Sequence, residues 1–311
     1  MAVEKEIWIN DIEENLFQGN EFLGASTDHS GFIAVSTNGT KVVHVPQAGT
    51  NPAVEVNRSV FPATASRRTD SDLTYNIDNY STDPIQVLNY QNMVTSYDKR
   101  MSVMGQHIEV LRETIGNNVA FKWAENATLA ASKIVTTTGA NSSTALAPSA
   151  TGTRNKITMD DIRSAASRLD KDLMPKSGRY LLMPTDLYYE LIGQDSVAYA
   201  NRFGNPTQQN GVVDVLYGFN IMTRPSVNVY DASTIIKAVG AAGAATDNYG
   251  CLFWQTSAVA LADGGIDVHI DSGDNGGGNP LYYGSVMSAE VNMGAKQLRT
   301  DLKGIGAIVQ A

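Results

Sequence analysis

The sequence contains few side chains whose type and spacing could support catalysis or hold a metal. Its four histidines, His29, His44, His107 and His269, are scattered, and no two have an HxH or HxxxH spacing. We expect each to be a surface or strand residue. Cys251 opens the apolar run CLFW beside no basic residue, which predicts a buried hydrophobe rather than a nucleophile. GxSxG and GxxxxGKS/T motifs are absent, so we expect no catalytic residue, no cofactor and no metal site.

A glycine-rich segment at 263–280 has a partial likeness to a calcium-binding loop. When the calcium-loop pattern is set from Asp271, Gly273 stands where a ligand is needed. Tyr282 stands where the bidentate glutamate belongs. These mismatches favour an exposed turn between two strands, and they leave open weak attraction of a cation by the acidic residues near Asp271.

Composition excludes several classes of protein. The 311 residues (33.4 kDa) are 42% hydrophobic, which is enough for a large buried core. The net charge of −9 argues against a sequence-independent nucleic-acid binder, which needs a basic surface to displace counterions. A single cysteine excludes a disulfide framework. The N-terminal segment has no secretory pattern and no stretch of 18 apolar residues occurs, so we expect a soluble protein made in a cytosol.

Two segments at the start of the sequence are predicted to extend from the body of the protein. Residues 1–37 carry seven acidic residues against one lysine and resemble an arm that is too short to hold its own core. Residues 38–83 predict a long hairpin, with a first strand at 42–45 that Pro46 stops. The returning strand, within 72–80, alternates apolar and polar residues. A polar tip of about twenty residues separates the two strands.

The strongest helical signal covers residues 91–124. Apolar residues at spacings of three and four form one stripe, made of Val94, Tyr97, Met101, Met104, Ile108, Leu111, Ile115 and Val119. Gly105 and Gly116 weaken this helix, and a kink there is possible on sequence grounds. A helix this long would span a compact protein of this size, which indicates a flattened or elongated molecule.

The rest of the chain mixes strands and helices. Residues 132–155 are rich in Ser, Thr, Ala and Gly, which is typical of a flexible loop or an inserted ribbon. Thr158 is the expected N-cap of a helix, and 179–183 (RYLLM) is a buried strand followed by a helix that Pro184 opens. Further strands follow to the C-terminus, and no internal repeat is present. The fold class is therefore α+β.

The two extensions need a partner to be stable. A two-stranded ribbon is marginal in water, and the tip of the 38–83 hairpin has only four apolar residues, Val54, Val56, Val60 and Phe61. We therefore expect the hairpin and the acidic arm to be ordered only against another subunit. A flat body with two such extensions is expected of a subunit that interlocks with its copies to form a sheet. Assembly would then be the function.

The order of these features resembles the tailed-bacteriophage major capsid proteins with the Hong Kong 97-type fold. The resemblance runs from about Thr40 to the C-terminus and includes YNIDNYSTDP, SYDKR before the long helix, RYLLMPTDLYYELI, YGFNIMTRPSV and the segment from YYGSVMSAEV to the end. It implies five parts along the chain. These are an N-terminal arm (1–37), an extended E-loop hairpin (38–83), a peripheral domain with a spine helix (84–179), an axial domain (180–265) and C-terminal strands that return to the core (266–311).

The resemblance also implies what the protein assembles with. It implies hexamers and pentamers that form an icosahedral shell around double-stranded DNA, without specific DNA binding and with no membrane. Because the arm begins at residue 1, a separate scaffolding protein is expected, together with a portal; decoration proteins are left open. No lysine lies between Pro46 and Asp83, so we expect none of the lysine–asparagine cross-links of some relatives. The location implied is the virion, after assembly in the cytoplasm of a bacterial host.

Three other interpretations are less consistent with the sequence. An encapsulin-type bacterial compartment shares this fold, but the long arm and the long E-loop speak against it. A tail or surface-adhesion β-protein is disfavoured by the long helix. An enzyme of unrecognised type has no residue pairing in its favour.

Five charged residues of the hairpin are candidates for contacts between subunits: Arg58, Arg67, Arg68, Asp70 and Asp72. Successive side chains of a strand point to opposite faces. The two adjacent arginines therefore cannot both pair with the neighbouring aspartates of one ribbon. We expect at least one of them to reach a carboxylate on a neighbouring subunit.

Overall fold

The structure of the chain is a computed structural model, and it describes residues 19–35, 41–49, 51–59, 61–62, 65, 67–88, 99–125, 133–193, 215–271, 284–299 and 301–311. The helices in these ranges are η1 (Glu21–Ala25), η2 (Ser30–Phe32), α2 (Lys99–Ala124), α3 (Met159–Lys171), α4 (Thr185–Gly193) and η5 (Thr256–Ala258). The early strands are β1 (Thr27–Asp28), β2 (Ile33–Val35), β3 (Lys41–Gln47), β4 (Ser71–Asn76), β5 (Asp78–Ser81), β6 (Ile85–Leu88), β7 (Ile134–Thr136), β8 (Asn141–Thr144) and β9 (Thr153–Asn155). The later strands are β10 (Arg179–Pro184), β11 (Val215–Leu216), β12 (Phe219–Arg224), β13 (Asn228–Tyr230), β14 (Asn248–Gln255), β15 (Val259–Asp271), β16 (Gly284–Gln297) and β17 (Ile305–Val309).

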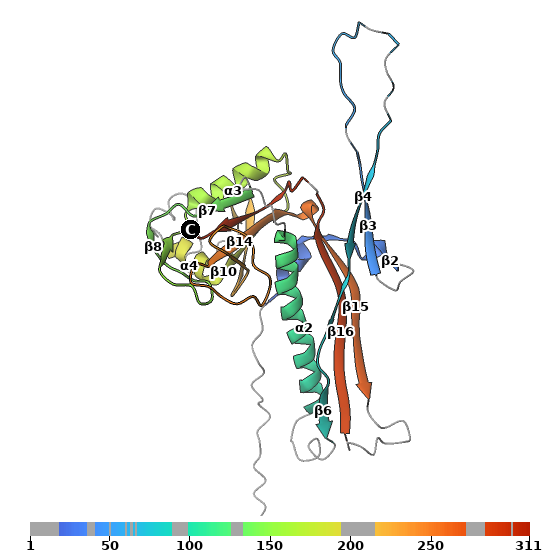
Figure 1. Cartoon of the computed structure of the whole chain (residues 1–311), viewed down its shortest axis with the longest axis vertical. Coiled ribbons are helices and arrows are strands. Elements are labelled where there is room, and N and C mark those ends of the chain that lie inside the picture. Colours follow the sequence, from blue (N-terminus) through green and yellow to red (C-terminus); the bar gives the residue numbers. More distant parts are fainter. Residues whose placement is uncertain are drawn as a thin grey trace, which may run out of the picture.

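The chain folds into two bodies and a projecting hairpin (Figure 1). The long-sheet body consists of β1, β15, β16, β5 and β6 with helix α2 along one face. The seven-stranded body consists of β11, β12, β10, β14, β17, β7 and β13 with α3 and α4. Figure 1 shows the seven-stranded body beside the upper end of α2, and the β3–β4 hairpin projecting beyond the same end of the long sheet. None of the helices in the described ranges is long and apolar enough to cross a membrane.

Helix α2 is the predicted long helix, but its buried face differs from the predicted stripe. Leu111, Ile115 and Val119 are buried as predicted. Nearer the N-terminus the prediction is wrong, because Met101 is 71% exposed whereas Val103 is buried. Met104 and Ile108 are only partly buried, and residues 91–98 lie outside the described residues. Apolar residues occupy more than one face of this half of the helix, so the packing against β16 decides which face is buried.

The burial of the C-terminal half of α2 predicts a stability difference between two positions on one helix. Leu111 is 4% exposed within the core shared by the two bodies. Leu111→Ala is expected to lower the free energy of unfolding by about 2–5 kcal/mol, because it removes buried methyl groups and leaves a cavity. Met101→Ala, on the exposed part of the same helix, is the matched control and should change it by less than ~0.5 kcal/mol. Urea unfolding followed by circular dichroism measures both, and equal effects would contradict the assignment of the buried face.

The seven-stranded sheet is covered on both faces, which explains its continuous apolar strands. Strand β10 lies between β12, which is parallel to it, and β14, which is antiparallel. Leu181 and Met183 pack with α3 and α4, whereas Leu182 and Trp254 face the core around α2. The predicted N-cap is confirmed, because Thr158 forms a capping box with Asp161 at the start of α3.

The sheets divide the chain differently from the predicted divisions at 179/180 and 265/266. Strand β7 pairs with β17 in the seven-stranded sheet, and α3 packs on that sheet, so residues 133–179 do not belong with the long helix. Residues 259–265 belong with the long sheet, because β15 pairs with β16 from Val259 onward. Within 132–155, residues 141–155 carry a β8–β9 ribbon, which is the second of the two predicted alternatives. The assignments of β7 and β15 depend on pairing between separate segments of the sequence, which a local pattern does not contain.

The described part of the arm packs on its own chain, contrary to the expectation that it needs another subunit. Phe22 is buried in the core around α2, and β1 pairs with β15. Strand β2, also within the predicted arm, pairs with β3 at the base of the hairpin. Residues 1–18 lie outside the described residues.

Two strand ends also differ from the predictions. Strand β3 continues through Pro46 to Gln47, because its pairing with β2 reaches only from Lys41 to Val43 and leaves that edge beside Pro46 without a β2 partner. The glycine-rich segment begins inside β15, where a β-bulge separates Asp263 from Ile266. Gly265 has φ +90° in this bulge, which glycine adopts without strain. The part of the predicted turn after Asp271 lies outside the described residues.

Candidate inter-subunit surface

The projecting hairpin exposes apolar side chains that have no core within the chain. Strands β3 and β4 pair in register from Val42↔Asn76 to Gln47↔Ser71, and residues 48–70 form the loop beyond them. No described residue of 48–70 is buried. Val54 is 90% exposed, Val56 81% and Phe61 74%. Exposed apolar residues gathered on one projection are typical of a surface that binds another protein.

Arg68 and Asp70 form a bidentate pair at the start of the returning strand. Arg68 Nε lies 2.7 Å from Asp70 Oδ1, and Nη2 donates to Oδ2 at 3.0 Å. The Gly49 backbone N–H also donates to Asp70 Oδ1 at 2.9 Å, from the outgoing side of the loop. The Arg68 guanidinium and this N–H lower the pKa of Asp70. The aspartate therefore ties the two sides of the loop together just beyond the paired strands.

The other three candidate residues are not brought together with this pair. Arg58 Nε lies 3.3 Å from Glu55 Oε2 near the tip of the loop. Asp72 Oδ2 lies 2.6 Å from His44 Nδ1 across the β3–β4 ladder. Arg67 is exposed, and no carboxylate of the described residues lies within 4 Å of its guanidinium. Arg67 is thus the arginine that remains available to a partner outside the chain, as far as the described residues go.

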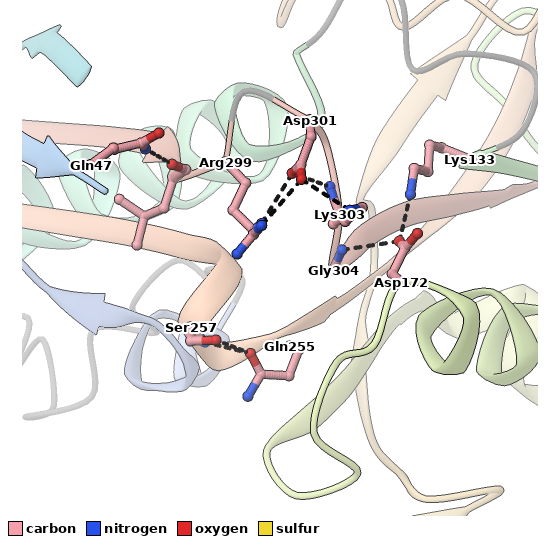
Figure 2. A network of polar contacts seen from close by, with 10 residues as sticks. Gln47, Lys133, Asp172, Gln255, Ser257, Arg299, Asp301, Lys303 and Gly304 are labelled. Atoms are coloured by element: carbon pink, nitrogen blue, oxygen red, sulfur yellow. Dashed lines mark hydrogen bonds and ion pairs between the residues drawn. The ribbon is translucent and has the colours of Figure 1, made fainter. Parts of the chain in front are cut away.

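The base of the hairpin is fixed to the turn between β16 and β17 (Figure 2). Gln47 Nε2 donates to the Leu298 carbonyl. One residue further on, Arg299 donates to Asp301 through Nε (3.0 Å) and Nη2 (3.1 Å), and the Lys303 backbone N–H donates to the same carboxylate at 3.2 Å. The arginine holds the pKa of Asp301 well below its usual range. The hairpin therefore leaves the body at a turn with a fixed shape.

The same turn is also tied to the seven-stranded body. Asp172, at the end of α3, accepts a hydrogen bond from Lys133 Nζ at 2.5 Å and one from the Gly304 backbone N–H at 3.2 Å (Figure 2). Both side chains of the Lys133–Asp172 pair are largely buried. This cluster therefore connects α3, the segment before β7 and the start of β17.

The chemistry-bearing residues singled out in the sequence are dispersed. His44 and His269 are exposed on β3 and β15, as expected. His29 and His107 are buried, which corrects the expectation of surface or strand residues. Burial lowers the pKa of both side chains. Cys251 is confirmed as a buried hydrophobe of β14, and burial raises the pKa of its thiol.

Sequence reasoning missed the residues that anchor the hairpin. Gln47 and Asp172 bind partners that are far away in the sequence, and no local pattern indicates these contacts. The His44–Asp72 pair depends on the register of the ladder, which places both side chains on one face at diagonal positions and which the sequence does not specify. The turn RTDLKG had a usable signal, because it concentrates opposite charges within five residues.

Comparison with known proteins places this architecture among virus shells. A family model described as Gp10A-like, major capsid protein, matches residues 76–263. The capsid structure of the cyanophage P-SCSP1u has 18% sequence identity, covers 96% of this chain and 90% of its own, and gives a TM-score of 0.68. The cyanophage Pam1 capsid has 9% identity, 99% and 96% coverage, and a TM-score of 0.67. A chain of Mycobacterium phage Che8 has 15% identity, 98% and 95% coverage, and a TM-score of 0.63. No curated protein matched the chain.

These findings confirm the predicted fold class and function. The structure is an α+β capsid fold of the tailed-phage type, and the encapsulin alternative is not favoured. The protein is a non-enzymatic, shell-forming coat protein of a phage virion, and copies of it assemble into a multi-subunit shell. Because the family model matches more than half of the sequence, we conclude that the chain belongs to the Gp10A-like family of major capsid proteins.

Proposed function

We propose that the β3–β4 hairpin is the E-loop of the subunit and that it holds neighbouring subunits together in the shell. The exposure of Val54, Val56 and Phe61 carries this proposal, because the loop has no core of its own and a two-stranded ribbon is marginal alone. Arg67 adds a cation that no described carboxylate of its own chain neutralises. A neighbouring subunit that offers an apolar strip beside a carboxylate would satisfy both kinds of group. The set Arg58, Arg68, Asp70 and Asp72 then shapes the loop or borders the contact.

The two bodies receive corresponding roles in this proposal. The seven-stranded body is the axial domain, which meets its copies around five-fold and six-fold axes in pentamers and hexamers of an icosahedral shell. The long-sheet body with α2 as its spine helix is the peripheral domain. The sheet pairings favour axial-domain segments of about 133–258 and 305–311 instead of 180–265. The 1–37 arm and the 38–83 E-loop keep their predicted limits, except that β2 pairs with the hairpin.

The shell is proposed to enclose double-stranded DNA without binding it specifically. A net charge of −9 supports this, because an anionic subunit has little counterion release to gain from phosphates. A separate scaffolding protein and a portal are the proposed assembly partners, on the family resemblance, and assembly would take place in the cytoplasm of a bacterial host.

Charge reversal in the loop tests the proposed contact. Arg67→Glu with Arg68→Glu should leave the melting temperature within about 1 °C of wild type, because neither side chain is buried. It should lower particle yield, since one arginine–carboxylate pair at an exposed rim contributes only ~0.2–1 kcal/mol but every subunit of a closed shell repeats it. Raised salt should weaken wild-type assembly in the same direction. Electron microscopy counts the particles.

A charge-matched control separates a local contact from a general change of net charge. Arg163→Glu with Lys171→Glu alters the charge equally on the exposed face of α3. Particle yields that are normal for the loop variant, or equally reduced in both variants, would show that the two loop arginines are only solvated surface residues.

A further inference from the structure

Arg224, at the end of β12, is a buried cation that joins three parts of the chain. Its guanidinium donates to the Gly19 carbonyl of the arm (Nε, 3.2 Å), to Asn117 Oδ1 (Nη1, 2.8 Å) and to the Glu113 carbonyl (Nη2, 3.4 Å), the last two on α2. It also lies 5.7 Å from the ring centroid of Phe22. Burial lowers its pKa to about 10, and the negative charge of Glu113 acts in the opposite direction. Its hydrogen bonds to the described residues go to neutral acceptors, one of which the arm supplies.

The arm meets α2 at a glycine. Asn20 Nδ2 donates to the Arg112 carbonyl of the helix. A Cβ placed on Gly116 would overlap Asn20 Oδ1 and would lie 2.7 Å from Asn20 Cγ and 3.0 Å from Arg224 Nη2. Around Gly105, in the same helix, a Cβ would have nothing within 4 Å. Gly116 thus provides the space in which the arm and Arg224 reach the helix backbone.

Aromatic side chains of α2 and β14 also contact the arm. The Phe22 ring packs edge-on against Trp123 of α2, with ring centroids 5.7 Å apart, and against Trp254 of β14 at 6.4 Å. Trp254 Nε1 donates to the arm carbonyl of Ala25 at 2.9 Å. The arm is therefore held by polar contacts at Gly19 and Asn20 and by an apolar side chain at Phe22.

We propose that residues 19–25 are a built-in peptide ligand, and that Gly116, Arg224, Trp123 and Trp254 form its binding site at the joint between α2 and the seven-stranded body. Arg224 is the positioning residue of this site, because it stands on β12 of the sheet and donates hydrogen bonds both to the arm and to the helix. The docked arm closes the joint, so the angle between the two bodies depends on whether the arm is in place.

Two glycine substitutions in one helix test the site. Alanine is normally better than glycine inside a helix, and Gly105→Ala should raise the melting temperature by about 1–3 °C. Gly116→Ala should instead lower it by about 3–8 °C, because the added Cβ collides with Asn20. Hydrogen exchange of the amides in 20–29, read in the unassembled subunit, should be roughly tenfold faster in Gly116→Ala and unchanged in Gly105→Ala.

A second substitution distinguishes a binding site from a general packing defect. Asn20→Ala removes the two atoms nearest to the new Cβ and leaves only the Arg224 contact at 3.0 Å, so Gly116→Ala with Asn20→Ala should recover at least half of the lost melting temperature and slow the exchange again. Gly116→Ala should also give particles with a broader range of diameters, and the double variant a narrower one. Stabilisation by Gly116→Ala, unchanged exchange at 20–29, or additive effects in the double variant would each overturn the proposal. The exchange and melting data come from single subunits, so they stand apart from the proposed E-loop contact.

Discussion

A chain with a shortened hairpin is expected to fold normally and to form no shells. The variant replaces residues 48–70 with Asn-Gly, so that Gln47 and Ser71, which are paired in the ladder, are joined by a two-residue turn. Asn-Gly is the preferred sequence for such a turn, because both central residues need positive φ. None of the described residues removed is buried, so the core loses nothing.

We expect shell assembly to be lost completely, because the shortened chain lacks the exposed apolar side chains of the loop that are proposed to contact the neighbouring subunit. Circular dichroism should give a melting temperature within about 2 °C of wild type, while sedimentation velocity and electron microscopy should show only unassembled subunits. A control of full length, with Val54, Val56 and Phe61 all changed to serine, tests whether these side chains or the length of the loop are required. Normal shells from the shortened chain would refute the assignment of the hairpin to subunit contacts.

The largest loss of stability is expected from Trp254→Ala. The indole is fully buried, its ring centroid lies 5.4 Å from that of Trp123 and 5.9 Å from that of Tyr180, and its N–H binds the Ala25 carbonyl. Truncating a buried tryptophan removes about 3–5 kcal/mol. A typical domain has only about 5–15 kcal/mol in total. We therefore expect a subunit that is partly unfolded at 37 °C.

Two comparisons make the tryptophan result interpretable. Trp254→Phe keeps an aromatic ring but leaves the Ala25 carbonyl without its donor, and it should lose about 1–3 kcal/mol. Tyr189→Ala, an aromatic truncation at an exposed position of α4, should lose less than ~0.5 kcal/mol. Denaturant unfolding followed by circular dichroism measures all three. A loss below 1 kcal/mol for Trp254→Ala would mean that the two bodies do not share this core.

The sequence predicts the elements of this fold better than it predicts how they are grouped. Alternation within 72–80 locates β4, and the covered strands RYLLM and CLFW stand out as apolar runs. Grouping depends on contacts between distant residues. The pairing of β7 with β17 joins segments about 170 residues apart, and nothing near Ile134 in the sequence indicates it.

In the candidate surface too, the sequence does not predict which residues contact one another. The charged candidates of the loop are visible in the sequence. Which of the two adjacent arginines has no ion pair with the described carboxylates follows only from the placement of Arg68 beside Asp70. The arm is expected to need another subunit because it is too short to hold its own core. The side chain that anchors it, Phe22, stands in a glycine-rich and polar stretch without periodicity, so no pattern indicates that it joins the core around α2.

The way in which the hairpin continues into the long sheet has a mechanical consequence. Only Ile77 separates β4 from β5, and the same run of chain then pairs with β16 through β5 and again through β6. A tension applied at the tip of the loop therefore acts along the axis of β16 and loads these antiparallel hydrogen bonds in shear, many at a time. A strand pulled sideways would lose them one after another. The subunit can therefore carry tension from the loop through β16, the longest strand in the described ranges.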